Sequence, residues 1–291
     1  MDRAIDLWRD LCERYNEPYG LPTWEEAGQW TRDKLYFWKR YIDITTRAMH
    51  DSRAFPGGLV YVDLFGGAGV CTLKGASKRR FPGSAIIAAH AARPFQKIIV
   101  CEQNPSLAEA CRIRLERTDA AGRCYVLVGD CNESVHQVAR MIPRRALTLA
   151  FVDPKGLDAQ FKTIEVLANN ARADFVVLFA DAYDAIRNIE HVYRPDPNSK
   201  LDQVLGPDSN WRKELDKLEN PDHVTRRKLF AEIYKRQLKR LLGYDYPDEK
   251  VMTFRGMPLY RLVYASKDKL GLKFWKEALK EDSGGQRGLF D

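Results

Sequence analysis

Several patterns are missing from this chain of 291 residues, and each absence removes a class of protein. The six cysteines form no C-x-x-C pair, and no histidine cluster lies near them, so the ligand spacing of a metal site is absent. No apolar run approaches the roughly 20 residues that span a bilayer. The first residues lack the basic-then-apolar layout of a signal peptide. We therefore expect a cytoplasmic protein that binds no metal and no membrane.

Two common phosphate-binding patterns are also missing. A glycine-rich turn is present at Gly66, Gly67 and Gly69, but the third glycine of G-x-G-x-x-G is absent and the next clear helix begins only near Ser84. A dinucleotide site needs that turn to run directly into a helix, whose N-terminus meets the pyrophosphate. No G-K-[ST] follows the glycines, which excludes a P-loop. A dinucleotide-dependent oxidoreductase is therefore disfavoured.

The central part of the chain alternates short apolar strands with helices. Strands are expected at residues 59–64, 97–102, 124–128, 147–152 and 175–180. Helices are expected between them at residues 84–92, 106–118, 133–141 and 161–169, with Ser84 capping the first. Strands that are apolar throughout indicate a parallel sheet covered by helices on both faces. The fold class is therefore a doubly wound, mostly parallel α/β sheet.

The segments outside this alternation predict the domain organisation. Helices at 3–15 and at 23–49, the second capped by Thr23, precede the sheet, and a hairpin at 251–254 and 259–265 and a helix at 270–279 follow it. A polar, proline-containing segment at 190–222, with a short helix at 211–218, leads into a basic helix at 223–242. The predicted parts are an N-terminal helical extension (1–55), an α/β core (56–189), a helical insertion (190–245), a hairpin and helix that complete the core (246–282) and a tail (283–291).

Acidic residues stand at the ends of four consecutive predicted strands: Asp63, Glu102, Asp130 and Asp153. In an open α/β sheet, ligands bind beyond the carboxyl ends of the strands. There Glu102 is placed to accept hydrogen bonds from ribose hydroxyls, and Asp130 to reach an adenine amino group. The alternative is that these acids only cap loops or helices. Because S-adenosylmethionine carries no phosphate, the loose glycine turn suits it better than a dinucleotide.

These residues give the candidate cofactor site and the candidate catalytic residues. The cofactor candidates are Asp63, Phe65, Gly66, Gly67, Gly69, Glu102, Asp130, Cys131 and Asp153. Cys71 and Cys131 fall beside this pocket, where a small wall residue is favoured over a nucleophile. Asp153 is the candidate that orients or deprotonates the acceptor. Lys155 is a second candidate at the reaction centre, which would meet a phosphate or face solvent.

The segment Asp63-Leu-Phe-Gly-Gly-Ala-Gly69 resembles the first motif of class I S-adenosylmethionine-dependent methyltransferases. More narrowly, the chain resembles the three-Cys-motif partner proteins over roughly residues 25–280. The matching segments are Trp30-Thr-Arg-Asp-Lys-Leu35, Tyr61–Gly69, Pro82-Gly-Ser84, Phe151-Val-Asp-Pro-Lys-Gly-Leu157 and the helix with Phe274-Trp275. The resemblance implies a seven-stranded methyltransferase sheet and, as a partner, a three-cysteine protein similar to radical S-adenosylmethionine enzymes.

One departure bears on the acceptor. Methyltransferases that act on the amino groups of bases often carry an aromatic residue directly after Asp-Pro, whereas Lys155-Gly156 follows here. The net charge of +7 is compatible with a polyanionic substrate. The residues expected to bind that substrate, at the rim of the pocket, are Lys74, Lys78, Arg79, Arg80, Tyr183 and Arg187. The first four belong to a loop that is expected at residues 71–81. For Tyr183, a plain packing role is the alternative.

The leading hypothesis is a methyltransferase that acts on RNA or DNA. The alternative is a non-catalytic module of the same fold, which binds S-adenosylmethionine or nucleic acid for a partner enzyme. The closing Gln286-Arg-Gly-Leu-Phe290 resembles the Q-x-x-L-F peptides that dock on the bacterial sliding clamp. The clamp is therefore a further candidate partner, with a packed or frayed terminus as the alternative.

Overall fold

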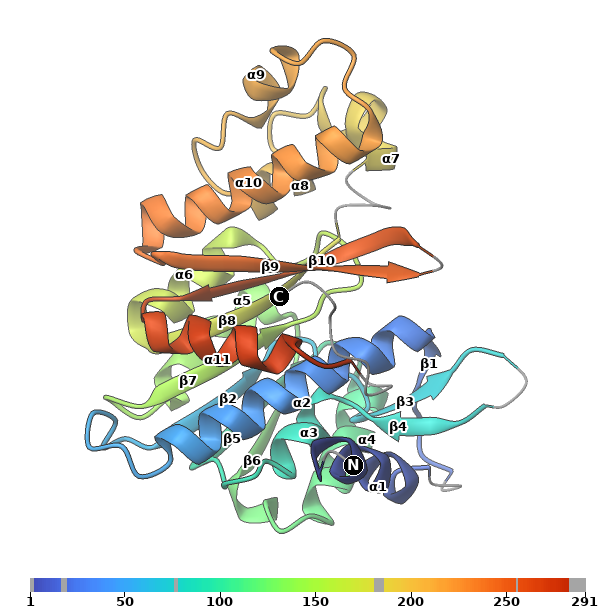
Figure 1. Ribbon diagram of the computed structural model, residues 1–291, viewed down its shortest axis with the longest axis vertical. Coiled ribbons are helices and arrows are strands. Elements are labelled where there is room, and N and C mark those ends of the chain that lie inside the picture. Colours follow the sequence, from blue (N-terminus) through green and yellow to red (C-terminus); the bar gives the residue numbers. More distant parts are fainter. Residues whose placement is uncertain (1–2, 17–19, 76–77, 181–185, 255, 283–291) are drawn as a thin grey trace.

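The fold is built on a seven-stranded sheet in the order β6-β5-β2-β7-β8-β10-β9 (Figure 1). The computed structural model describes residues 3–16, 20–75, 78–180, 186–254 and 256–282. The strands of this sheet are β2 (Leu59–Asp63), β5 (Lys97–Glu102), β6 (Cys124–Val128), β7 (Leu147–Val152), β8 (Arg172–Phe179), β9 (Tyr246–Phe254) and β10 (Met257–Ser266). The helices that flank it are α1 (Arg3–Arg14), α2 (Gln29–Met49), α3 (Ser84–Ala89), α4 (Pro105–Glu116), α5 (Cys131–Met141), α6 (Phe161–Asn170) and α11 (Lys269–Leu279).

Five of the seven strands, β6, β5, β2, β7 and β8, form parallel pairs. Strand β10 pairs with β8 and β9 in antiparallel fashion, so it alone runs against the other six. This arrangement confirms the predicted doubly wound sheet of five parallel strands completed by a hairpin. The chain starts in the middle of the sheet at β2 and builds outward on each side in turn, so the switch point lies beside β2.

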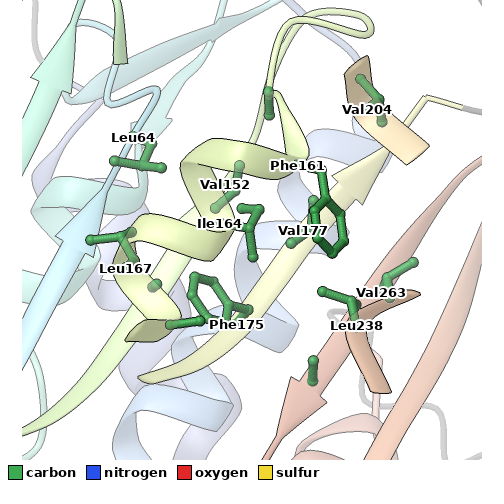
Figure 2. Close-up of a cluster of buried hydrophobic side chains, with 14 of the residues drawn as sticks. Leu64, Val152, Phe161, Ile164, Leu167, Phe175, Val177, Val204, Leu238 and Val263 are labelled. Carbon is green, nitrogen blue, oxygen red and sulfur yellow. The ribbon is translucent and has the colours of Figure 1, made fainter. Parts of the chain in front are cut away.

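The sheet is buried on both faces because its strands are apolar on both sides. In β2, Val60 and Val62 belong to one hydrophobic cluster, whereas Leu59 and Tyr61 belong to the other. Figure 2 shows the first cluster, where α6 lies against β7 and β8 with Ile164 and other apolar side chains between them. Helices α2, α3, α4 and α11 cover the opposite face. Both faces of the parallel sheet are thus removed from water, as predicted.

A second, three-stranded sheet was not predicted. Strands β1 (Trp24–Ala27), β3 (Val70–Leu73) and β4 (Arg80–Pro82) form it in the order β1-β3-β4. The expectation that residues 71–81 are only a loop is therefore wrong at both ends of that segment. The main chain leaves the glycine turn as a strand because it finds pairing partners in β1 and β4.

Two predicted helix caps are also wrong. The second helix begins at Gln29 with Gly28 as its N-cap, because residues 24–27 pair with β3 as a strand. Thr23 instead shares a hydroxyl–hydroxyl hydrogen bond of 2.6 Å with Thr72. Helix α3 is capped by Gly83, and Ser84 is already its first residue. In both places tertiary contacts decide where the helix starts.

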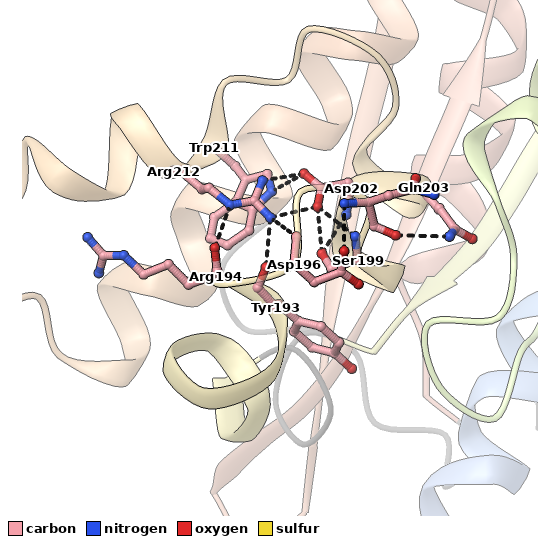
Figure 3. Close-up of polar contacts among 9 residues, drawn as sticks. Tyr193, Arg194, Asp196, Ser199, Asp202, Gln203, Trp211 and Arg212 are labelled. Atoms are coloured by element: carbon pink, nitrogen blue, oxygen red, sulfur yellow. Dashed lines mark hydrogen bonds and ion pairs between the residues drawn. The ribbon is translucent and has the colours of Figure 1, made fainter.

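The insertion contains α7 (Ile186–Asn188), a π-helical turn (Ile189–Tyr193), α8 (Lys200–Leu205), α9 (Trp211–Asp216) and α10 (His223–Leu242). Figure 3 shows the polar network that joins the π-helical turn, α8 and α9, in which the Arg212 guanidinium donates to the Asp202 carboxylate at 2.6 Å and to the carbonyl of Tyr193 at 2.7 Å. The Trp211 indole N–H also donates to Asp202, at 2.8 Å. These bonds fix α8 and α9 relative to each other. Across the described ranges, no helix combines the length and apolarity that crossing a bilayer would require.

Candidate functional site

A cavity of about 740 Å³ lies at the carboxyl ends of the parallel strands. Its walls come from the glycine turn after β2, the ends of β5, β6 and β7, the start of α2 and the hairpin strand β10. Of the predicted cofactor residues, those that line it are Phe65, Gly66, Gly67, Gly69, Glu102, Asp130, Cys131 and Asp153. The topology therefore brings together eight of the nine residues that the sequence singled out.

The glycine turn is shaped by close packing against β5. The Gly66 N–H donates to the carbonyl of Cys101 at 2.9 Å, and a Cβ at Gly66 would lie 2.1 Å from a methyl of Val100. Gly67 has a φ of +57°, which favours glycine, and its N–H donates to the Glu102 carboxylate at 2.8 Å. The turn then enters β3. The element that follows the turn directly is thus a strand and not a helix whose N-terminus could bind a pyrophosphate, which further disfavours a dinucleotide.

Glu102 and Asp130 each have a structural role as well as a place in the cavity wall. The second oxygen of Glu102 accepts the N–H of Asn104 at 2.8 Å. Asp130 is the N-cap of α5 and accepts the N–H of Asn132 at 2.7 Å. The alternative reading of these acids as caps is thus partly correct. Each carboxylate oxygen has a second lone pair, so both residues can still accept hydrogen bonds from a ligand.

Asp63 lies beneath the glycine turn and is fully buried, outside the cavity wall. Its carboxylate accepts the Tyr61 hydroxyl at 3.1 Å and the Phe65 N–H at 3.2 Å. Burial raises the pKa of Asp63 to about 7, and hydrogen bonds from Ser84, Phe65 and Tyr61 oppose that rise. In this structure Asp63 therefore supports the turn from below.

Asp153 forms an ion pair with a residue that sequence reasoning missed. The Lys34 ammonium of α2 donates to Asp153 at 2.5 Å, and the two side chains are 6% and 21% exposed. Lys34 lies one helical turn before Trp38, on the buried side of α2. A lysine within that apolar stripe was the available signal, because a buried lysine needs a partner.

Aromatic side chains surround this ion pair. The Lys34 nitrogen lies 5.7 Å from the centre of the Tyr260 ring, and the Lys155 nitrogen lies 5.4 Å from the centre of the Trp24 ring. The Tyr260 hydroxyl donates to the carbonyl of Trp30 at 3.4 Å. Trp24, Trp30 and Tyr260 all line the cavity together with Lys155. Sequence reasoning missed these rings because they come from β1, α2 and β10.

The insertion closes another side of the cavity through α8. Lys200 forms an ion pair with Asp158 at 2.8 Å, and the Gln160 amide donates to Gln203 at 3.1 Å. The loop after β7 is held in place by Asn132, which bonds the carbonyl of Asp158 and the N–H of Gln160. These polar residues also line the cavity and were not predicted.

The two cysteines of the wall are Cys71 and Cys131, which are 9% and 4% exposed. Burial raises the pKa of Cys71 to about 12 and also raises the pKa of Cys131. Both thiols therefore stay protonated near neutral pH, and neither is an activated nucleophile. This favours the predicted role of small wall residues.

Of the residues expected to bind the substrate, the four at the β3–β4 connection lie outside the cavity wall. Lys74, Lys78 and Arg79 are exposed at the β3–β4 connection, and Arg79 pairs with Glu13. The Arg80 N–H is bound by the Asn16 side chain at 3.0 Å. Tyr183 lies outside the described residues. Arg187 belongs to α7, but its side chain is not among those described.

Comparison with known proteins identifies the fold. No protein-family model matches the chain, and no curated protein matches it by sequence. A crystal structure of a Legionella pneumophila protein from the DUF519 family aligns at 12% identity over 85% of this chain and 91% of that one, with a TM-score of 0.51. A Bacillus cereus O-methyltransferase structure in complex with SAH aligns at 11% identity over 92% of each chain, with a TM-score of 0.44. The alignment with the Legionella protein supports the fold that the strand order and the flanking helices show, a doubly wound, Rossmann-like α/β sheet.

Proposed function

We propose that this protein is an S-adenosylmethionine-dependent methyltransferase that acts on RNA or DNA. The observation that carries the proposal is one continuous cavity that joins the glycine turn and its acids to the buried Lys34–Asp153 pair. The first part suits a nucleoside that carries no phosphate. The second part offers a carboxylate beside the place where an acceptor would be held.

The residues of the cavity fit this cofactor in their chemistry. Carboxylates such as those of Glu102 and Asp130 accept hydrogen bonds from hydroxyl and amino groups, which a nucleoside supplies. The same carboxylates would repel a pyrophosphate. Gly67 opens toward free space, since a Cβ there would meet nothing within 4 Å. A volume of about 740 Å³ lies in the range of cofactor pockets.

When bound, S-adenosylmethionine would supply an electrophilic methyl group, which a lone pair of the acceptor would take up while the electron pair of the broken bond leaves with sulfur. The Asp153 carboxylate then accepts the proton that the acceptor atom releases. Lys34 holds that carboxylate in position through their contact of 2.5 Å. The remaining walls orient the acceptor toward the methyl group.

The preference for nucleic acid is supported by the net charge of +7 and by the exposed lysines at the β3–β4 connection. Phosphate contacts of this kind position a strand without reading its sequence. The resemblance to the three-Cys-motif partner proteins adds a three-cysteine protein as the proposed partner. Docking of the tail on a sliding clamp is a separate proposal, and residues 286–290 lie outside the described residues.

A second function is favoured by one observation. The Lys34 ammonium already pairs with the Asp153 carboxylate and neutralises its charge. Such a pairing is also expected in a module that binds cofactor or nucleic acid without catalysing transfer. Such a module would leave the chemistry to its partner enzyme.

Calorimetry and a labelling assay separate these functions. S-adenosylmethionine and its demethylated product are expected to bind, and NAD is not. Labelled S-adenosylmethionine is then incubated with cellular RNA, DNA or protein, with and without the three-cysteine partner, and label is expected in nucleic acid. Absence of binding by both sulfur compounds would refute the methyltransferase. Binding without any labelled product, even with the partner present, would support the module instead.

A further inference from the structure

The part of the cavity around Lys34 and Asp153 has the walls of a pocket for a flat ring. Trp24, Trp30 and Tyr260 supply three aromatic side chains, and Leu178 and Leu259 add apolar surface. Trp24 and Trp30 are half-buried, so part of each ring is open to a ligand. Aromatic faces bind planar rings by stacking, with little regard for the identity of the ring.

The ion pair within this pocket presents a hydrogen-bond donor next to an acceptor. The Lys34 ammonium has three N–H groups, and the Asp153 carboxylate has free lone pairs beyond the one that Lys34 uses. The pairing edge of every nucleobase carries a donor beside an acceptor, and single strands are read at that edge. In a duplex this edge is occupied by the opposite base. A ring bound here by its edge must therefore be unpaired.

The surroundings of Trp24 suit the phosphates of a strand that enters the pocket. Strand β1 pairs with β3 through Trp24 and Cys71, and the Lys74 N–H donates to the carbonyl of Ala27 at 2.8 Å. The exposed ammonium groups of Lys74 and Lys78 thus belong to the hairpin that borders the strand carrying Trp24. Cations beside stacking rings are the usual combination in proteins that bind single strands.

We propose that this pocket holds one unpaired base of a single-stranded RNA or DNA, stacked on Trp24 and bound by its pairing edge to Lys34 and Asp153. The proposal rests on the proposed function, because it names the acceptor of the same site. Apart from Asp153 at the end of β7, it places recognition of the acceptor on β1, α2 and β10.

The test measures binding of short oligonucleotides to the full chain by fluorescence anisotropy, with and without the demethylated cofactor product. The probes are a single strand with one adenine or cytosine in a uridine or thymidine background, the same strand with an abasic site at that position, and the corresponding duplex. RNA and DNA versions of each probe distinguish the two sources. The intact single strand is expected to bind more tightly than the abasic strand and the duplex.

Variants of Trp24 identify the stacking ring. Trp24→Leu is expected to weaken binding of the intact strand roughly five- to 150-fold, the loss of one stacked base. Trp24→Phe keeps a ring and should restore most of the affinity. Tyr125→Leu is the matched control, because Tyr125 is 42% exposed on edge strand β6 and lies outside the cavity wall. It should bind like the parent protein.

Two results would overturn the proposal: equal binding of intact and abasic strands, or unchanged binding by Trp24→Leu. Calorimetry with S-adenosylmethionine on the same samples distinguishes this failure from failure of the proposed function. Cofactor binding that persists while the base preference is absent refutes only the acceptor pocket. If the parent protein does not bind S-adenosylmethionine, the proposed function itself is refuted.

Discussion

The Lys34–Asp153 ion pair joins positions that are 119 residues apart in the sequence. Both side chains are largely withdrawn from water, so each charge depends on the other for compensation. The pair therefore links helix α2, which precedes the main sheet in the sequence, to the end of β7. It is a structural link as well as a candidate catalytic element, and the two roles can be separated by mutation.

We predict that Asp153→Asn destabilises the fold by about 2 kcal/mol, less than the ~3–5 kcal/mol for a fully buried pair, because it leaves the Lys34 ammonium without its anion. The double variant Lys34→Met with Asp153→Asn should recover most of that loss, since no buried charge remains. Urea unfolding measures both free energies. Methyl transfer should stay low in both variants.

The control for the Lys34 and Asp153 variants is Glu277→Gln, which breaks the exposed ion pair between Glu277 and Lys280. That change should alter the free energy of unfolding by less than about 1 kcal/mol. A double variant as unstable as Asp153→Asn alone would contradict the compensation argument.

Asp63 predicts a dependence of stability on pH. In the unfolded chain its carboxyl group titrates near its usual pKa of 3.8, whereas burial raises the pKa to about 7 in the folded protein. Between these values the folded state binds more protons, so stability falls as the pH rises and levels off above about 7. In the Asp63→Asn variant no charge is buried at this position. The fall in the free energy of unfolding between the two pKa values, about 4 kcal/mol in the parent protein, should therefore be absent from the variant.

The measurement is the free energy of unfolding in urea at a series of pH values between 4 and 8. The difference between Asp63→Asn and the parent protein should grow in favour of the variant as the pH rises toward 7. Other titrating groups, such as His90, are present in both proteins, so their contributions to the pH dependence cancel in that difference. A difference that is constant with pH would show that Asp63 does not titrate in this range.

At the scale of elements, the junction between β1 and α2 positions an aromatic wall. A Cβ at Gly28 would lie 2.3 Å from the ring of Trp30, so the ring packs directly on the glycine. Gly28 has a φ of −89°, which alanine also adopts, so the backbone itself is not strained by the change. Trp30 is held in the cavity wall because position 28 has no side chain.

We predict that Gly28→Ala displaces the Trp30 ring, with an overpacking cost of about 1–3 kcal/mol. Binding of single strands should weaken, while calorimetry with S-adenosylmethionine should give an unchanged affinity. Gly20→Ala is the matched control, because a Cβ there meets nothing within 4 Å. Unchanged strand binding by Gly28→Ala would separate Trp30 from the acceptor pocket.

The elements also show what the sequence can and cannot predict. Strands β5, β6 and β7 occupy the predicted residues because each is a short apolar run bounded by polar turns. The strand β1 was predicted as helix because its residues 24–27 carry no apolar alternation, and pairing with β3 decides their conformation. The half of the cavity that is proposed for the cofactor was predictable, since its residues follow four consecutive strands. The half that is proposed for the acceptor was not, because Trp24, Lys34 and Tyr260 meet only through the tertiary fold.

At the scale of the whole molecule, the protein has a net charge of +7, and only some of its basic residues are paired with acids. The basic helix α10 faces acids of its surroundings: Lys235 pairs with Glu232 and Glu249, and Arg236 pairs with Glu214. By contrast, Lys74 and Lys78 are exposed and form no ion pair with any residue that the structure describes. The two lysines of the β3–β4 connection therefore offer a polyanion positive charge that no described carboxylate neutralises, unlike Lys235 and Arg236 of α10.

This distribution predicts where salt dependence arises. Each phosphate contact on a single strand contributes about 0.7 to the slope of log affinity against log salt concentration. Lys74→Gln with Lys78→Gln should therefore lower that slope by about 1.4. The matched variant Lys235→Gln with Arg236→Gln removes the same two charges from α10 and should leave the slope nearly unchanged, because those cations already have carboxylate partners. Oligonucleotide titrations at several salt concentrations measure both. Equal slopes for the two variants would mean that nucleic-acid binding responds to the net charge of the protein alone. A larger effect of the α10 variant would mean that the nucleic acid binds along α10 and not at the β3–β4 connection.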